Sequence, residues 1–309
     1  MFINNRRNFG NTDIKVSPLG FGTYELRRNS VGKKEASELL NIALDNGINY
    51  IDTSASYGKS EELIGKTIAH RRDEFILATK CGHKIDEKGN IVGGYDWSRD
   101  NLFRSLDNSL KLMKTDYVDV MQLHNIEPEK HLQKGKDSMI IKTLEEMKGT
   151  GKVRYIGVSF RNSQKGDELY PSGYAYKGLK QVKDWGAFDV IQVVYGALIR
   201  KSELLIKRAS DKGIAIVVRG ILNRYFDNYE ELFKKAKLQD FCGDDENIND
   251  FLIRFALSTP GISTMIIGTK NPVHLKSNIE IVNKGKLSEV IYEKAKKRLD
   301  RVGVKPVQP

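Results

Sequence analysis

Short apolar runs of strand length alternate along the chain with longer segments in which apolar residues recur at helical spacing. This alternation is typical of parallel strands joined by crossover helices. The clearest helical segments are residues 33–46, 61–70, 99–114, 138–149, 202–212 and 248–257. Eight apolar runs are predicted to be strands, at residues 16–22, 48–51, 75–80, 117–123, 153–158, 190–193, 214–218 and 263–267. Eight strand-helix pairs predict an α/β fold, the closed (β/α)8 or TIM barrel.

Glycine residues mark the ends of several predicted helices. Gly47, Gly151 and Gly213 each stand just before a predicted strand, where a left-handed glycine ends a helix and turns the chain back. No linker rich in proline or glycine divides the chain, so residues 1–309 are expected to form a single barrel domain. Residues 7–16 predict a β-hairpin that closes the bottom of the barrel, and further helices are expected after the last strand.

Three long segments follow predicted strands, at residues 81–98, 125–137 and 219–246. Barrel enzymes build their active sites from the loops at this end of the strands. Aromatic side chains in such loops suit the wall of a substrate pocket, although packing alone explains each ring equally well. Substrate contacts are expected from Tyr24, Trp97 and Tyr225.

Four ionisable residues lie at or just beyond strand ends, and we expect them to share one site: Asp52, Tyr57, Lys80 and His124. A tyrosine is a poor proton donor because its ordinary pKa is about 10, but a nearby cation lowers that pKa. Lys80 can supply the cation, and a buried lysine needs a carboxylate such as Asp52 to stay charged. His124 can donate a hydrogen bond to a substrate oxygen. Each residue taken singly also has a structural explanation.

Composition narrows the function classes. The net charge of +11 raises the question of nucleic-acid binding, but the basic residues are scattered and no basic motif interleaved with aromatic residues stands out. The densest basic stretch, residues 294–301, has the mixed charge of a solvated helix. Nucleic-acid binding is therefore not expected, and a small anionic ligand explains the charge equally well.

Membrane and metal partners are not expected either. No apolar stretch approaches the roughly 20 residues needed to span a bilayer. The N-terminus lacks the apolar region and cleavage site of a secretory signal, so a cytoplasmic protein is expected. Cys81 and Cys242 are too few for a disulfide framework or a metal site.

Several motifs make the chain resemble the aldo-keto reductase superfamily. They are GINYIDTSASYG at residues 47–58, ATKC at 78–81, DYVDVMQLH at 116–124 and IGVS at 156–159, and the likeness extends over nearly the whole chain. The resemblance implies that the four ionisable residues are a catalytic tetrad with Tyr57 as general acid.

The resemblance also implies a nicotinamide cofactor across the top of the barrel. The Rossmann fingerprint is absent, because Glu25 stands where its third glycine belongs. By resemblance, Ser159 and Gln192 hold the carboxamide and Tyr195 stacks on the nicotinamide. The remaining residues expected around the cofactor are Gly22, Thr23, Arg219, Gly268, Thr269, Lys270, His274 and Asn278.

The choice of cofactor rests on the last of these segments. Pro272 is expected in the first turn of a helix whose N-terminus suits an anion. Lys270 is expected to pair with the 2′-phosphate of NADP, and Asn278 to contact adenine. Phe160 stands where many members have an asparagine that contacts the carboxamide. His274 stands where some members place an arginine against the adenosine phosphate, so NADP(H) is expected with NAD(H) still possible.

These expectations describe an oxidoreductase that interconverts an aldehyde or ketone and an alcohol by hydride transfer. One alternative is a dehydrogenase that oxidises a cyclic aldose at C1 with NAD, because YDWS at residues 95–98 resembles sugar-oxidising members. Another, from a different class, is a nicotinamide-binding regulatory subunit, against which the intact tetrad argues. The expected partner is a small carbonyl or sugar molecule, and both a monomer and a small homo-oligomer fit the sequence.

Overall fold

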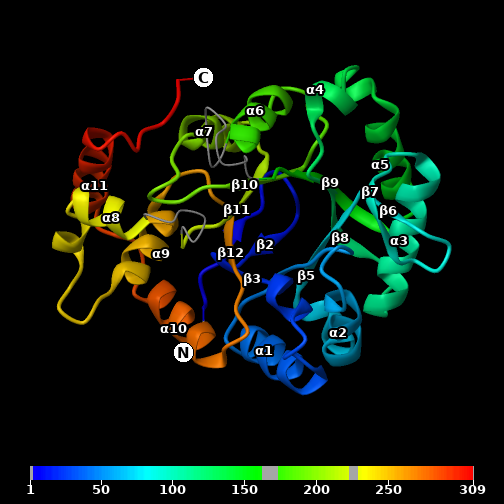
Figure 1. Ribbon diagram of the computed structural model, residues 1–309, viewed down its shortest axis with the longest axis horizontal. Helices are drawn as coiled ribbons and strands as arrows, with labels where there is room; N and C mark the ends of the chain where they lie inside the picture. Colours follow the sequence, from blue (N-terminus) through cyan, green and yellow to red (C-terminus); the bar gives the residue numbers. More distant parts are fainter. Residues whose placement is uncertain (1–2, 162–172, 223–228, 309) are drawn as a thin grey trace.

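The computed structural model describes residues 3–161, 173–222 and 229–308. Within these ranges, eight parallel strands close into a barrel in the order β10-β11-β12-β3-β4-β5-β8-β9 (Figure 1). The barrel strands are β3 (Leu19–Gly22), β4 (Tyr50–Asp52), β5 (Ile76–Cys81), β8 (Val118–His124), β9 (Val153–Ser159), β10 (Val190–Val194), β11 (Ala215–Arg219) and β12 (Thr264–Ile267). The predicted (β/α)8 fold is confirmed, and most strand bounds differ from the predicted ones by one or two residues.

The first predicted strand, residues 16–22, is in fact two strands. Val16 belongs to β2 (Lys15–Val16), which pairs with β1 (Arg7–Asn8), and the barrel strand begins only at Leu19. Pro18 has no N–H to donate to a ladder. The N–H of Ser17 donates instead to the side chain of Asn49 at 2.7 Å, so the chain bends between the two strands.

The β1–β2 hairpin lies at the N-terminal end of the barrel strands, as predicted. The N–H of Asn11 donates to the carbonyl of Gly213, just before β11, at 2.7 Å. A Cβ on Gly10, whose φ is +60°, would lie 2.4 Å from that same carbonyl oxygen, so only glycine fits the turn. Phe9 is fully buried and packs against Tyr50 inside the barrel, with ring centroids 5.5 Å apart. The hairpin therefore forms the floor of the barrel.

Helices surround the strands on the outside, and their apolar faces pack against the barrel (Figure 1). Most of them end where sequence predicts, and the glycines after α1, α5 and α7 have the expected positive φ. The helix expected at 61–70 ends earlier and continues as the 3-10 turn η2 (Ala69–Glu74). The α-helices around the barrel are α1 (Lys33–Asp45), α2 (Ser60–Thr67), α3 (Arg99–Met113), α5 (Met139–Gly149), α6 (Gly173–Val182), α7 (Glu203–Asp211), α9 (Ile248–Ser258), α10 (Pro272–Asn283) and α11 (Glu289–Arg301).

The long segments after the strands contain regular structure of their own. The segment 81–98 forms an antiparallel hairpin of β6 (His83–Ile85) and β7 (Ile91–Tyr95). The side chain of Asn101 in α3 holds this hairpin, because it donates to the His83 carbonyl at 3.0 Å and accepts from the Ile85 N–H at 3.1 Å. Short helices in the other two segments are α4 (Pro128–His131), η3 (Gly135–Asp137), α8 (Tyr229–Lys235) and η4 (Leu238–Phe241).

Two further observations concern the expected partners. None of the helices in the described ranges is long and apolar enough to cross a bilayer. The described residues also contain no group of histidine, cysteine, aspartate and glutamate side chains that could hold a metal ion.

Candidate active site

The four ionisable residues come together at the C-terminal ends of three neighbouring barrel strands. Asp52 ends β4, Lys80 lies one residue before the end of β5, and His124 ends β8. Tyr57 lies in the turn between β4 and α2, which is closed by a hydrogen bond from its N–H to the Ser54 carbonyl at 2.9 Å. The parallel register of these strands brings the four side chains to one face, as the sequence predicts.

A buried ion pair forms the base of the site. The Lys80 Nζ donates to the Asp52 Oδ2 at 2.7 Å and to the Thr53 carbonyl at 2.6 Å. The other Asp52 oxygen accepts from the amides of Gln192 at 2.8 Å and Gln122 at 3.4 Å. Burial alone would lower the pKa of Lys80, but the Asp52 carboxylate and Tyr57 outweigh burial and raise that pKa. Lys80 therefore stays charged at neutral pH.

The half-buried Tyr57 lies above this ion pair. The Lys80 Nζ is 4.9 Å from the centroid of its ring, and a hydrogen bond with Tyr57 contributes to the raised pKa of Lys80. The ring of Tyr24 contacts Tyr57 edge to face at 5.0 Å and is 45% exposed, so it forms one wall of an open site. The site thus places the positive charge of Lys80 beside the Tyr57 ring.

His124 lies on the other side of Tyr57, with ring centroids 6.0 Å apart. Its Nδ1 is within hydrogen-bond distance of the Ser54 hydroxyl, at 3.2 Å, and of the Ser56 hydroxyl, at 3.4 Å. Burial, followed by the charge of Lys80, lowers the pKa of His124 well below its ordinary value. The imidazole is therefore neutral at neutral pH, and when Ser54 donates to Nδ1, the Nε2 atom carries the proton that can be donated to a substrate oxygen.

Sequence reasoning did not single out Ser54 and Ser56, although both lie in the short segment between Asp52 and Tyr57. Serine hydroxyls can both donate and accept, so they fix the orientation of an imidazole without adding charge. Their position between two tetrad residues is the sequence feature that could have pointed to them.

The β6–β7 hairpin supplies an aromatic wall beside His124. The indole of Trp97 stacks on Tyr95 with ring centroids 5.5 Å apart and planes 3° apart. The ring of His83 lies between Tyr95, at 4.6 Å, and His124, at 5.2 Å. Trp97, Tyr95 and His83 therefore form a row of rings that leads to His124. Gly82 has a φ of +110°, and a Cβ there would lie 2.1 Å from the Trp97 ring.

Three of the expected cofactor residues are linked to Asp52: Gln192 and Thr23 directly, and Ser159 through Gln192. The Ser159 hydroxyl donates to the side-chain Oε1 of Gln192 at 2.7 Å, and the Gln192 Nε2 donates to the Asp52 carboxylate. The hydroxyl of Thr23 donates to the Asp52 carbonyl at 3.0 Å. Arg219 at the end of β11 donates to the Phe160 carbonyl at 2.7 Å. These contacts place the expected carboxamide residues at the base of the site.

Tyr195 lies in a different environment from the one expected. Its side chain is completely buried, and its hydroxyl is 3.0 Å from Glu203 and 3.1 Å from Thr259. A ring that stacks on a ligand needs an accessible face, which this ring lacks. Stacking by Tyr195 would require rearrangement of the core, and we do not include it among the proposed cofactor contacts. Tyr225 lies outside the described residues.

The segment after β12 fits an anionic group. A Cβ on Gly268 would lie 2.5 Å from the Gly22 carbonyl oxygen, so the ends of β12 and β3 approach closely. The helix α10 begins at Pro272, after the side chain of Asn271 caps it by accepting from the Val273 N–H at 2.9 Å. The neighbouring residues Thr269 and His274 are at least partly exposed, and Asn278 is buried.

Lys270 is exposed just before this helix N-terminus. It lies 3.4 Å from the Ser30 hydroxyl and forms no ion pair within the described part of the chain. A helix N-terminus beside an unneutralised lysine is a suitable site for a phosphate. The residues present therefore fit the phosphate-bearing end of a nicotinamide dinucleotide.

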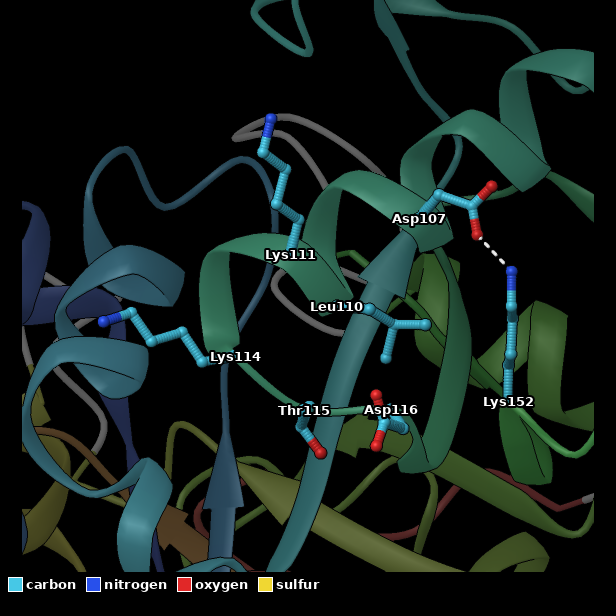
Figure 2. A pocket seen from close by; sticks show the side chains of 7 residues that line it. All are labelled: Asp107, Leu110, Lys111, Lys114, Thr115, Asp116 and Lys152. Carbon is cyan, nitrogen blue, oxygen red and sulfur yellow. Dashed lines mark hydrogen bonds and ion pairs between the residues drawn. The ribbon is translucent and has the colours of Figure 1, made fainter.

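A separate surface cavity of about 450 Å³ lies away from the tetrad. Figure 2 shows that its lining includes the end of α3 and the chain just before β8, with Lys152 paired to Asp107 at 2.7 Å. His124 is at the opposite end of β8, so this cavity belongs to the other face of the barrel. It does not contribute to the candidate active site.

Comparison with known proteins identifies the family. Residues 18–298 match the model of the aldo/keto reductase family. The chain is 26% identical over 306 residues to the uncharacterized oxidoreductase YqkF of Bacillus subtilis, with 92% of this chain and 93% of that protein covered. It is 35% identical over 163 residues to the L-galactose dehydrogenase of Arabidopsis thaliana, with 50% and 47% covered.

A solved structure agrees with the sequence matches. The holo form of aldo-keto reductase AKR11C1 from Bacillus halodurans superposes with a TM-score of 0.78 at 25% identity, covering 95% of this chain and 96% of that one. The family match spans the barrel and all four tetrad residues. The chain belongs to the aldo/keto reductase family of oxidoreductases.

Proposed function

We propose that the protein interconverts an aldehyde or ketone and the corresponding alcohol, with NADP(H) as the preferred cofactor and Tyr57 as the general acid and base. The observation that carries the proposal is the chain of contacts from Asp52 through Lys80 to Tyr57. A buried lysine held charged beside a half-buried tyrosine places a positive charge where transfer of the tyrosine proton to a carbonyl oxygen would leave a negative one.

Each tetrad residue has a distinct part in the reduction. His124 donates a hydrogen bond from Nε2 to the carbonyl oxygen and orients it. Tyr57 donates its hydroxyl proton to that oxygen as negative charge develops there. Lys80 stabilises the resulting phenolate, and Asp52 keeps Lys80 protonated. When bound, the nicotinamide supplies the hydride. In the oxidative direction the Tyr57 phenolate takes the proton back.

The proposed cofactor contacts divide into two groups. At the base of the site, Ser159 and Gln192 hold the carboxamide, with Gly22, Thr23 and Arg219 around them. At the other end, Lys270 binds the 2′-phosphate beside the start of α10, with Gly268, Thr269, His274 and Asn278. The exposed ammonium of Lys270, which forms no ion pair with any described residue, is the reason for preferring NADP(H).

An assay with both cofactors tests the proposal. The purified protein is mixed with NADPH or NADH and a panel of simple aldehydes and ketones, and the loss of nicotinamide absorbance is followed. We expect turnover with NADPH at lower cofactor concentrations than with NADH. Absence of turnover across the panel, with either cofactor and in either direction, would contradict the proposal.

A sugar dehydrogenase is the second candidate. It is favoured by the matches to L-galactose dehydrogenase and, at 34% identity over 166 residues, to the 6-dehydroglucose reductase of Novosphingobium aromaticivorans, each covering 50% of this chain. The exposed ring of Tyr95, stacked on Trp97, offers a flat apolar surface of the kind that suits a sugar ring. Faster oxidation of aldoses with NAD than reduction of simple aldehydes with NADPH would favour this candidate. Turnover of either kind excludes a purely regulatory subunit.

A further inference from the structure

Arg27 places a positive charge beside the candidate active site. It is the last residue of the 3-10 turn η1 (Thr23–Arg27), which follows β3 directly. Its guanidinium carbon lies 4.1 Å from the centroid of the Tyr24 ring, in a cation-π contact. Tyr24 in turn contacts the ring of Tyr57 at 5.0 Å. One aromatic ring therefore links the Arg27 guanidinium to the proposed proton donor.

The charge of Arg27 is not neutralised within the described part of the chain. The nearest carboxylate in sequence, Glu25, pairs instead with Arg28 at 3.0 Å. The Nε atom of Arg27 is buried without a hydrogen-bond partner among the described residues. A buried donor of a charged group that lacks an acceptor is unfavourable, and the contact with one aromatic ring offsets this only in part. An anionic acceptor would satisfy it.

The position of Arg27 favours a substrate group as that acceptor. A Cβ on Gly58, the residue after Tyr57, would lie 3.7 Å from the Cβ of Arg27, so the arginine runs alongside the turn that carries Tyr57. Its stacking partner Tyr24 is 45% exposed and forms a wall of the open site. Arg27 is half-buried, which weakens competition from water and salt.

We propose that Arg27 is a specificity-determining residue that binds a carboxylate or phosphate group carried by the carbonyl substrate. The preferred substrates are then carbonyl compounds with an anionic group a few atoms from the reacting carbon. This inference rests on the proposed function, because it assumes that Tyr57 protonates the carbonyl oxygen. The phosphates of the cofactor share the same chemistry, so the experiment separates the two sources.

The test compares 4-carboxybenzaldehyde with 4-methylbenzaldehyde, two substrates of similar size that differ in charge. Arg27→Met keeps an unbranched apolar stem against Tyr24 and removes the charge, and Arg27→Lys restores a charge without the planar fork. Arg28→Met is the matched control, since its arginine is already paired with Glu25. In Arg27→Met we expect kcat/KM for the carboxylated aldehyde to fall about tenfold or more, mainly through KM.

The uncharged aldehyde and the other two variants show whether the effect depends on charge. In Arg27→Met we expect kcat/KM for the methylated aldehyde to change less than twofold. Arg27→Lys should recover part of the lost kcat/KM for the carboxylated aldehyde, and Arg28→Met should leave the preference for that aldehyde unchanged. Equal losses for both aldehydes in both Arg27 variants would overturn the proposal, because Arg27 would then only support Tyr24. A wild-type enzyme that does not prefer the carboxylated aldehyde would also overturn it. So would a weaker NADPH affinity in Arg27→Met, measured by fluorescence titration, with an unchanged aldehyde preference.

Failure of the proposed function is distinguishable from failure of this inference. If the wild-type protein turns over neither aldehyde with either cofactor, calorimetric titration with terephthalate, a dicarboxylate of similar shape, replaces the assay. Binding that is lost in Arg27→Met and kept in Arg28→Met would support the anion site. Undetectable binding to the wild type, or equal binding to all three proteins, would overturn it.

Discussion

The carboxyl group of Glu61 accepts a 2.5 Å hydrogen bond from the hydroxyl of Thr79, and both side chains are buried. The other carboxyl oxygen accepts from Ser109 in α3 at 3.1 Å. Glu61 lies in the first turn of α2, four residues after Tyr57, and Thr79 immediately precedes Lys80. The bond therefore joins the two segments that carry the proposed proton donor and its cation.

Glu61 should make stability depend on pH. Burial raises its pKa from 4.5 to about 7, despite hydrogen bonds from Thr79 and Ser109 that act in the opposite direction. The folded protein thus binds more protons than the unfolded chain between these two values, so the stabilisation is fully present below 4.5 and is lost as pH rises through about 7. We expect the free energy of unfolding of the wild type to fall by up to about 3 kcal/mol between pH 5 and 8 because of Glu61. Glu61→Gln should remove this fall, and urea unfolding measures it. The control is Glu62→Gln, at a neighbouring side chain that is 44% exposed. Parallel pH profiles for the wild type and both variants would contradict the assignment.

Replacing Tyr57 with phenylalanine should remove most of the turnover while sparing cofactor binding. Phenylalanine keeps the edge-to-face contact with Tyr24 and loses only the hydroxyl. General acid catalysis contributes about 10²- to 10⁴-fold, so kcat should fall by that order. The NADPH dissociation constant, from fluorescence titration, should stay within twofold. Tyr24→Phe is the control for removing a hydroxyl from the same wall, and full activity of Tyr57→Phe would refute the mechanism.

Breaking the buried ion pair should destabilise the fold. In Lys80→Met the Asp52 carboxylate, 2% exposed, is left without its counter-charge. Removing one partner of a buried pair typically costs about 3–5 kcal/mol. We expect a loss of that order in urea unfolding and no measurable turnover. The double variant with Asp52→Asn should recover part of the stability and none of the activity. If the double variant were no more stable than the single one, the charge argument would fail.

Lys270→Met should weaken the binding of NADPH without weakening the binding of NADH. The variant removes the proposed partner of the 2′-phosphate and leaves the start of α10 unchanged. Because a hydrogen bond to a charged group contributes about 1.5–3 kcal/mol, the NADPH dissociation constant should rise roughly tenfold to a hundredfold. NADH binding should not change. Lys276→Met, an exposed lysine on the same helix, is the matched control. Equal affinities of the wild type for NADPH and NADH would disprove the role of Lys270.

Gly82→Ala should perturb the aromatic wall specifically. An alanine Cβ would overlap the Trp97 ring, and the φ of +110° is unfavourable for any side chain. Gly93→Ala imposes a similar backbone strain, at a φ of +91°, with nothing within 4 Å of the added Cβ. We therefore expect a larger rise in KM for aryl aldehydes in Gly82→Ala than in Gly93→Ala. Equal KM values would mean that Trp97 does not contact the substrate.

The barrel and the position of the tetrad follow from local pattern. Parallel strands buried on both faces are continuous apolar runs, and the ionisable residues stand at their ends. Since parallel strands place their C-terminal ends on one face, the meeting of Asp52, Lys80 and His124 needs no knowledge of distant contacts. Tyr57 lies close to them because the turn that joins it to Asp52 is short.

Features that depend on tertiary contacts could not be predicted from the sequence. The strand β7 contains Gly93 and Gly94, both with positive φ, and is exposed along its whole length, so it shows no strand pattern. The environment of Tyr195 is set by Glu203 and Thr259, the latter 64 residues away in sequence. Glu61 resembles any other acidic residue in a first helical turn until its contacts with Thr79 and Ser109 are known. Such contacts are selected by packing and leave no local signal.

The β1–β2 hairpin covers the N-terminal end of the barrel strands. Phe9 occupies the interior beneath the tetrad, and the backbone of Gly10 lies against Gly213. Because packed side chains fill the interior there, we expect the substrate of the proposed reaction, and the proton that restores the Tyr57 hydroxyl, to arrive at the C-terminal end of the strands.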